Sequence, residues 1–95
     1  MPAEGGEPAR ATAEVVARRS YGKLVAFLAA RTRDVAGAED ALSDAFAAAL
    51  TDWPESGVPD RPEAWLMAVA RRKLIDAARR RRSLTESADH LRQMA

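Results

Sequence analysis

The sequence predicts an all-α protein: a compact three-helix bundle that can add a short fourth helix at its C-terminus. Twenty-two of the 95 residues are Ala, whereas Val and Ile together number only seven, so few residues favour strands. Apolar residues also recur at three- and four-residue intervals, as on one face of a helix. A chain of 95 residues suits one domain. We expect a flexible arm over residues 1–11, a helical domain over residues 12–82, and a linker or short tail helix over residues 83–95.

The first helix is expected to begin near Thr12, which is a plausible N-cap. Upstream of it, Met1 to Pro8 is rich in Gly, Pro and Glu, a composition typical of a weakly ordered arm. The helix then carries one apolar stripe, made of Ala17, Tyr21, Leu24, Val25 and Leu28.

The second helix has the clearest periodicity in the chain. Asp34 can cap its N-terminus, where a carboxylate also suits the positive end of the helix dipole. Its predicted apolar face consists of Val35, Ala38, Leu42, Ala45, Phe46, Ala49 and Trp53. Because Pro54 disfavours a helical conformation at the residue before it, we expect the helix to end at Trp53. The loop up to Asp60 is then long for a connection between helices.

The third helix is expected to begin at Pro62, with Asp60 or Arg61 as its cap, and to run to about Arg81. Its predicted core face consists of Leu66, Val69, Ala70, Leu74 and Ala77, flanked by Trp65. Ser83 and Glu86 fit the capping-box pattern, which predicts a separate short helix to about Met94.

Several classes of function are excluded by what the sequence lacks. It has no Cys, one His and no Gly-rich loop before a helix, so we predict neither an enzyme nor a protein with a cofactor. Glu39, Asp40 and Asp44 could in principle bind a metal, but a solvated acidic face is the better interpretation and we predict no metal site. No uncharged run exceeds seven residues, and the N-terminus does not resemble a secretory signal. We therefore expect a cytoplasmic protein without a membrane partner.

Charge is strongly segregated along the chain although the net charge is only +1. Residues 34–60 carry a net charge of −7, and residues 71–82 carry +6. This asymmetry predicts either two partners of opposite charge or two helices that neutralise each other within one bundle.

The exposed face of the second helix is a candidate docking surface for a basic helix. The third helix is a candidate nucleic-acid surface, because arginines bind phosphate through bidentate, always-charged forks. Four consecutive arginines at residues 79–82 cannot all be buried, so the end of this helix should extend beyond the bundle.

Three motifs together resemble region 2 of the bacterial extracytoplasmic-function sigma factors. They are the segment Ala38 to Phe46, the pair Trp53 and Pro54 followed by Gly57 to Pro59, and the segment Pro62 to Arg71 with Asp76, Arg79 and Arg80 beyond it. The resemblance spans about residues 15–82. It implies a helical domain that docks on the clamp helices of the RNA polymerase β′ subunit and that recognises and melts the minus-ten promoter element.

The resemblance also assigns roles to individual residues. The polymerase-binding set is Glu39, Asp40, Ser43, Asp44 and Ala47. The DNA-binding set is Arg71, Arg72, Lys73, Ile75, Arg79 and Arg80. The loop that would hold an extruded base of the single-stranded non-template strand comprises Trp53, Glu55, Ser56, Gly57, Val58 and Asp60. For both tryptophans, packing in the core is the simpler interpretation.

The helix-turn-helix region 4 of this family has no counterpart in the sequence. We therefore expect either a fragment of a longer factor or a single-domain relative, with region 4 or an anti-sigma factor as further candidate partners. A second interpretation remains, namely a helical interaction module or a homo-oligomeric bundle whose acidic and basic helices pair between protomers.

Overall fold

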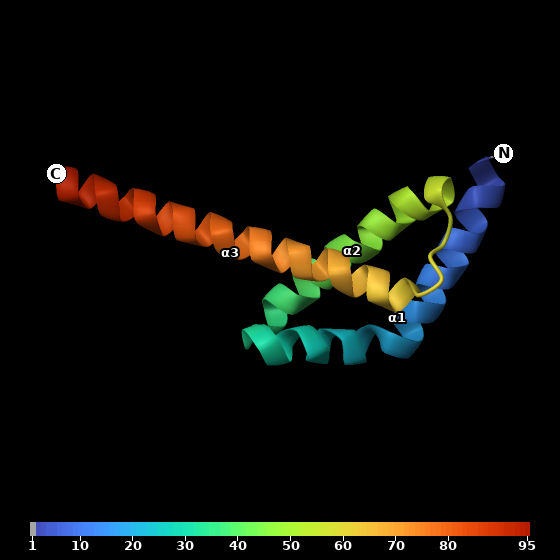
Figure 1. Cartoon of the computed structure of the whole chain (residues 1–95). Coiled ribbons are helices and arrows are strands. Elements are labelled where there is room, and N and C mark those ends of the chain that lie inside the picture. The colour runs from blue at the N-terminus through green and yellow to red at the C-terminus, as the bar shows by residue number, and fades with distance from the viewer. Residues whose placement is uncertain (1) are drawn as a thin grey trace.

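The protein consists of three α-helices in the computed structural model, which describes residues 2–95 and the side chains from residue 6 onward (Figure 1). Helix α1 spans Pro2–Thr32, α2 spans Val35–Ser56 and α3 spans Pro62–Met94. The described residues contain no strand, which confirms the predicted all-α fold. Helix α2 lies at the centre of the arrangement, because α1 and α3 each contact α2 more extensively than they contact each other.

Helix α1 begins at Pro2, so the prediction that it begins near Thr12 is wrong. Ala9, Ala13 and Val16 are buried in the core, and their spacing extends the apolar stripe by two turns. The prediction relied on the Gly- and Pro-rich composition and missed this burial. Met1, the first residue of the expected arm, lies outside the described residues. Ala9 and Leu28 belong to the same core, and α1 bends partway along its length to reach it (Figure 1).

Helix α2 continues one turn past the predicted end at Trp53. Pro54 lies inside its last turn, and the helix ends at Gly57, whose N–H donates to the Trp53 carbonyl at 2.8 Å. Gly57 has φ +91°, a left-handed conformation that glycine adopts without the steric cost of a Cβ atom. The helix therefore ends at this glycine, and the connection to α3 is short.

Alanine dominates the core. Of the thirteen buried hydrophobic residues in the described part of the chain, seven are Ala. The largest fully buried side chains are Trp53, Leu28, Leu42 and Leu66. Val35, expected in the core, is 57% exposed because it is the first residue of α2 at the edge of the bundle, and Ala41 is buried instead.

Helix α3 is continuous to Met94, so Ser83 does not begin a separate helix. Thr85 Oγ1 donates to the Arg81 carbonyl at 3.0 Å, as in the interior of a helix. Every residue after Leu84 is exposed, as are Ser83 and Leu84, and Figure 1 shows this end of α3 projecting alone. We call residues 83–95 the overhang. It lengthens the molecule to 59 Å and raises the radius of gyration to 16.9 Å, against about 12 Å for a compact chain of this length.

Candidate protein and nucleic-acid interfaces

The exposed face of α2 carries the predicted acidic set. Glu39, Asp40, Ser43, Asp44 and Ala47 are all exposed. They face outward because Ala38, Leu42 and Ala45, each 0% exposed, fix the opposite face of α2 in the core. The acidic set is therefore exposed to solvent, as the sequence predicted.

The N-terminal cap of α2 fixes the start of this face. Asp34 Oδ1 accepts the Gly37 N–H at 3.0 Å, and the Asp34 carbonyl accepts the Ala38 N–H at 3.0 Å. A Cβ atom on Gly37 would overlap Asp34 Oδ2, so the closeness of the carboxylate depends on glycine at this position. The predicted cap is confirmed.

One groove between α2 and α3 contains both acidic and basic residues. It is lined by Asp34, Gly37, Asp40, Ala41 and Asp44 from α2 and its cap, and by Lys73, Leu74, Ala77, Arg80 and Arg81 from α3. Members of the predicted polymerase-binding and DNA-binding sets therefore meet at this groove.

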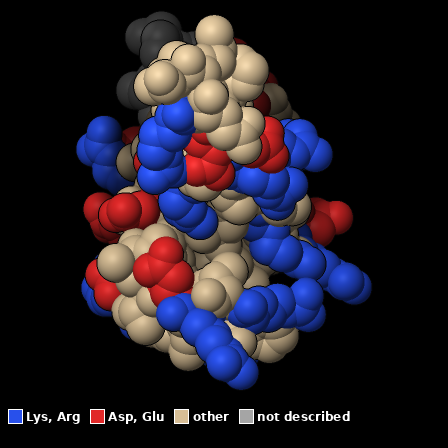
Figure 2. All heavy atoms as spheres, turned by 90° about the vertical axis from the view of Figure 1, so that its left-hand side faces the viewer, with Lys and Arg blue, Asp and Glu red and all other residues tan. Residues whose placement is uncertain are grey.

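The opposite charges in this groove do not form ion pairs. Within residues 6–95, the ion pairs are Arg18 with Glu14 and Arg92 with Asp89, and each lies within one helix. The acidic side chains of α2 and the basic side chains of α3 therefore share this groove without a direct ion pair. Figure 2, which views the molecule from the side of the overhang, shows Lys and Arg side chains projecting into solvent with Asp and Glu between them.

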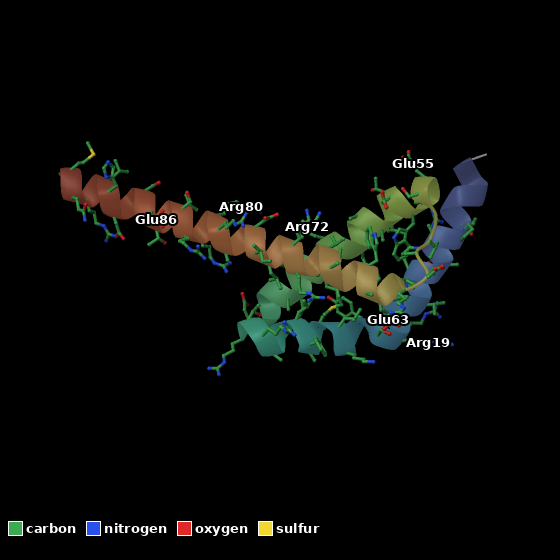
Figure 3. The ribbon with its side chains drawn as sticks, viewed as in Figure 1. Arg19, Glu55, Glu63, Arg72, Arg80 and Glu86 are labelled. Atoms are coloured by element: carbon green, nitrogen blue, oxygen red, sulfur yellow. The ribbon has the colours of Figure 1, made fainter. Side chains whose placement is uncertain are left out.

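A second groove lies between the later part of α2 and an earlier stretch of α3. It is lined by Ala48, Asp52, Trp65, Ala68, Val69, Arg72, Lys73 and Asp76. Arg72 and Arg80 extend from the same side of α3 (Figure 3). Asp52 was not among the predicted site residues, although it lies in the acidic segment of residues 34–60. Only the fold shows that it lies beside Arg72.

The rest of the predicted DNA-binding set faces elsewhere. Arg71 and Ile75 line a groove toward the end of α1, together with Leu28, Arg31, Thr32 and Leu74. Arg79 is exposed. The six predicted residues thus surround α3 rather than forming one flat face.

The predicted base-binding loop is shorter than expected. Glu55 and Ser56 belong to the exposed last turn of α2, and Val58 is partly buried against the core. Gly57 and Asp60 are exposed.

Trp53 lies in the core at 1% exposure. Its ring meets Trp65 edge-on with the ring centroids 5.3 Å apart, and no hydrogen-bond partner lies within reach of its Nε1. Trp53 cannot stack on a base without leaving the core, and its burial agrees with the interpretation of this tryptophan as a core residue. Trp65 is half-buried and reaches the second groove.

None of the helices in the described part of the chain is both long enough and apolar enough to cross a membrane. The fold and its charged, exposed helix faces define a helical binding domain. The family model for sigma-70 region 2 matches residues 16–84, and the chain belongs to this family. The family comprises transcription initiation factor domains, which are not enzymes and which bind core RNA polymerase and the minus-ten promoter element.

The chain is also similar to an uncharacterized protein, R00370, from Rhizobium meliloti (strain 1021). The two are 46% identical over 43 residues, which is 45% of this chain and 10% of that protein. No solved structure matches the chain.

Proposed function

We propose that this chain acts as the region 2 domain of an extracytoplasmic-function sigma factor. The exposed acidic set on α2 binds the clamp helices of the RNA polymerase β′ subunit. The single observation that carries this assignment is the match to sigma-70 region 2 over residues 16–84, which includes both charged helix faces. A cytoplasmic location follows from that role, and region 4 or an anti-sigma factor would be a further partner.

The electrostatics of α2 support binding to a basic helix. Residues 34–60 contain seven acidic and no basic residues, so the face keeps one sign of charge over its whole length. Asp40 and Asp44 are one helical turn apart and exposed, and Ala47 follows on the same surface without a bulky side chain. A basic helix can therefore approach closely and find complementary charge.

The basic stretch of α3 supports binding to the promoter. All seven basic residues between residues 71 and 82 are exposed, and none forms an ion pair within the described side chains. We propose that they bind the phosphates of the minus-ten element, while Ser56, Gly57 and Asp60 surround an extruded base of the non-template strand. The isolated domain should therefore prefer single-stranded non-template DNA to duplex DNA, because it then avoids the cost of melting.

Charge reversal on α2 tests the polymerase assignment. We expect Asp40→Lys with Asp44→Lys to reduce binding to an isolated β′ clamp-helix fragment by more than tenfold without loss of helicity. Glu7→Lys with Glu86→Lys is the matched control, because both residues are exposed on other surfaces and the change in net charge is the same. Equal binding by the first variant and the wild type, measured by fluorescence anisotropy, would exclude this face as the polymerase contact.

A further inference from the structure

A groove follows the line where α1 passes the start of α3, apart from the two grooves beside α2. Its lining includes Lys23, Leu24 and Phe27 of α1 with Glu63, Met67 and Arg71 of α3. Arg71 also lines the hollow that contains Arg31 and Ile75, so the two hollows are continuous. We call them together the α1–α3 groove. Its α1 side contains none of the predicted site residues.

Phe27 presents an aromatic ring to this groove without an aromatic partner in the core. It is 57% exposed. The other four aromatic side chains form two pairs: the ring centroids of Tyr21 and Phe46 are 6.3 Å apart, and those of Trp53 and Trp65 are 5.3 Å apart. Among the described side chains, Phe27 belongs to no such pair. Its exposed ring is therefore free to stack on a ligand.

Three basic side chains surround Phe27. Lys23 and Arg31 lie four residues before and four residues after it on α1, each about 6 Å away along the helix axis. Arg71 lies across the groove on α3. All three are exposed, and none forms an ion pair within the described side chains. Glu63, in the first turn of α3, is the one carboxylate of the lining. The groove thus places unpaired positive charge on both sides of an exposed ring.

We propose that the α1–α3 groove binds single-stranded DNA, with one base stacked on Phe27 and the flanking phosphates on the three basic side chains. A basic groove that carries aromatic side chains is the general arrangement by which proteins bind single strands. This site rests on the proposed function and extends it. It adds Lys23, Phe27 and Arg31 of α1 to a DNA surface otherwise made of α3 and the loop before it.

The position of the groove favours single-stranded DNA over an acidic protein as its occupant. The groove begins in the first turn of α3, directly after the loop that is proposed to surround an extruded base (Figure 1). A strand that leaves this loop therefore reaches the α1–α3 groove next. Farther along, the groove contains Arg71 and Ile75, which belong to the proposed DNA-binding set. An acidic helix seated there would cover these two residues and exclude the strand.

Binding of fluorescein-labelled oligothymidylate, followed by anisotropy, tests the stacked base. About 12 nucleotides are enough, because a single binding domain covers roughly 4–16 nucleotides. Phe27→Ala should weaken binding by roughly 5- to 150-fold, the range for loss of one stacked base. Phe27→Leu keeps an apolar side chain and should lose nearly as much, whereas Phe27→Trp retains a ring and should bind like the wild type. Val15→Ala is the matched control, since Val15 is 44% exposed on α1 outside the groove.

An abasic strand of the same length separates stacking from charge. It has the same phosphates and no bases, so the wild type and Phe27→Ala should bind it equally. Lys23→Ala and Arg31→Ala should each reduce the slope of log affinity against log salt by about 0.7, the value for one phosphate of a single strand. Arg10→Ala, an exposed residue of α1 outside the groove, should leave the slope unchanged. Circular dichroism verifies that every variant remains helical.

Three results would overturn the proposed site: unchanged oligothymidylate binding in Phe27→Ala and Phe27→Leu, equal binding of base-bearing and abasic strands by the wild type, or unchanged salt slopes in the Lys23 and Arg31 variants. Polyglutamate that binds with the same dependence on Phe27 would assign the groove to an acidic protein instead. A wild-type chain that binds no single-stranded DNA would contradict the proposed function itself. DNA binding that does not depend on Phe27 or its basic neighbours would contradict only this inference.

Discussion

The N-terminal cap of α2 allows a prediction about Gly37, at which substitution by alanine has two opposing effects on stability. Asp34→Ala removes the hydrogen bond from the Gly37 N–H to Asp34 Oδ1, which spans 3.0 Å. Loss of such a cap costs about 1 kcal/mol of folding free energy. In a domain of this size, that loss lowers the melting temperature by roughly 4–8 °C.

Gly37→Ala should have almost no effect by itself. Alanine favours the helix over glycine by about 0.5–1 kcal/mol. The added Cβ atom, however, would overlap Asp34 Oδ2 and lie 2.9 Å from Asp34 Cγ, so it displaces the carboxylate and breaks the cap. The gain and the loss are of similar size, and the net change should be close to zero.

The double variant should then show non-additive behaviour. With Asp34→Ala already present, no carboxylate remains near residue 37, and Gly37→Ala should stabilise by the full value of about 0.5–1 kcal/mol. The two substitutions thus couple by about 1 kcal/mol, which is measurable by urea denaturation of the four proteins followed by circular dichroism. Additive effects, or a Gly37→Ala change that is equally stabilising in both backgrounds, would refute the reasoning about the cap.

Three further predictions concern the core, the phosphate contacts and the loop. Leu42→Ala should cost about 2–5 kcal/mol, because Leu42 is 0% exposed, and a cooperative melt at the wild-type temperature would contradict this placement. Arg79→Ala with Arg80→Ala should weaken binding to all oligonucleotides alike and flatten its dependence on salt, as titrations at several salt concentrations will show. Substitution of Ser56 or Asp60 should instead change which base is preferred at one position of the single strand; a uniform loss of affinity would argue against base recognition by this segment.

The elements that sequence predicted well are those with a strong local signal. Asp34 as the cap of α2, and Leu24 and Leu28 as core residues of α1, follow from spacing and cap chemistry that act within a few residues. The predicted acidic set is exposed for the same reason, since its position on α2 is fixed by the buried face opposite.

Elements that depend on tertiary contacts or on competing local signals were not predicted. Ala9 looks like part of a Gly- and Pro-rich arm until the core is seen to cover it. Pro54 predicts that α2 ends at Trp53. The helix instead continues to Ser56, because Trp53 is buried in the core and Gly57 has the positive φ that ends the helix. The division of the basic residues among separate grooves arises from how α1 and α2 flank α3, which spacing along α3 alone does not reveal.

The abundance of alanine in the core has a consequence for how this domain can change during evolution. The distance between two packed helices depends on the side chains at their contact. Because Ala41, Ala45 and Ala70 are buried, the core has little side-chain volume to lose at these positions, and larger side chains there would force the helices apart. Packing confines substitutions in such a core to very small residues, but it does not constrain the outward faces of α2 and α3 in this way. Partner preference can therefore diversify on a scaffold whose interhelical spacing stays nearly constant.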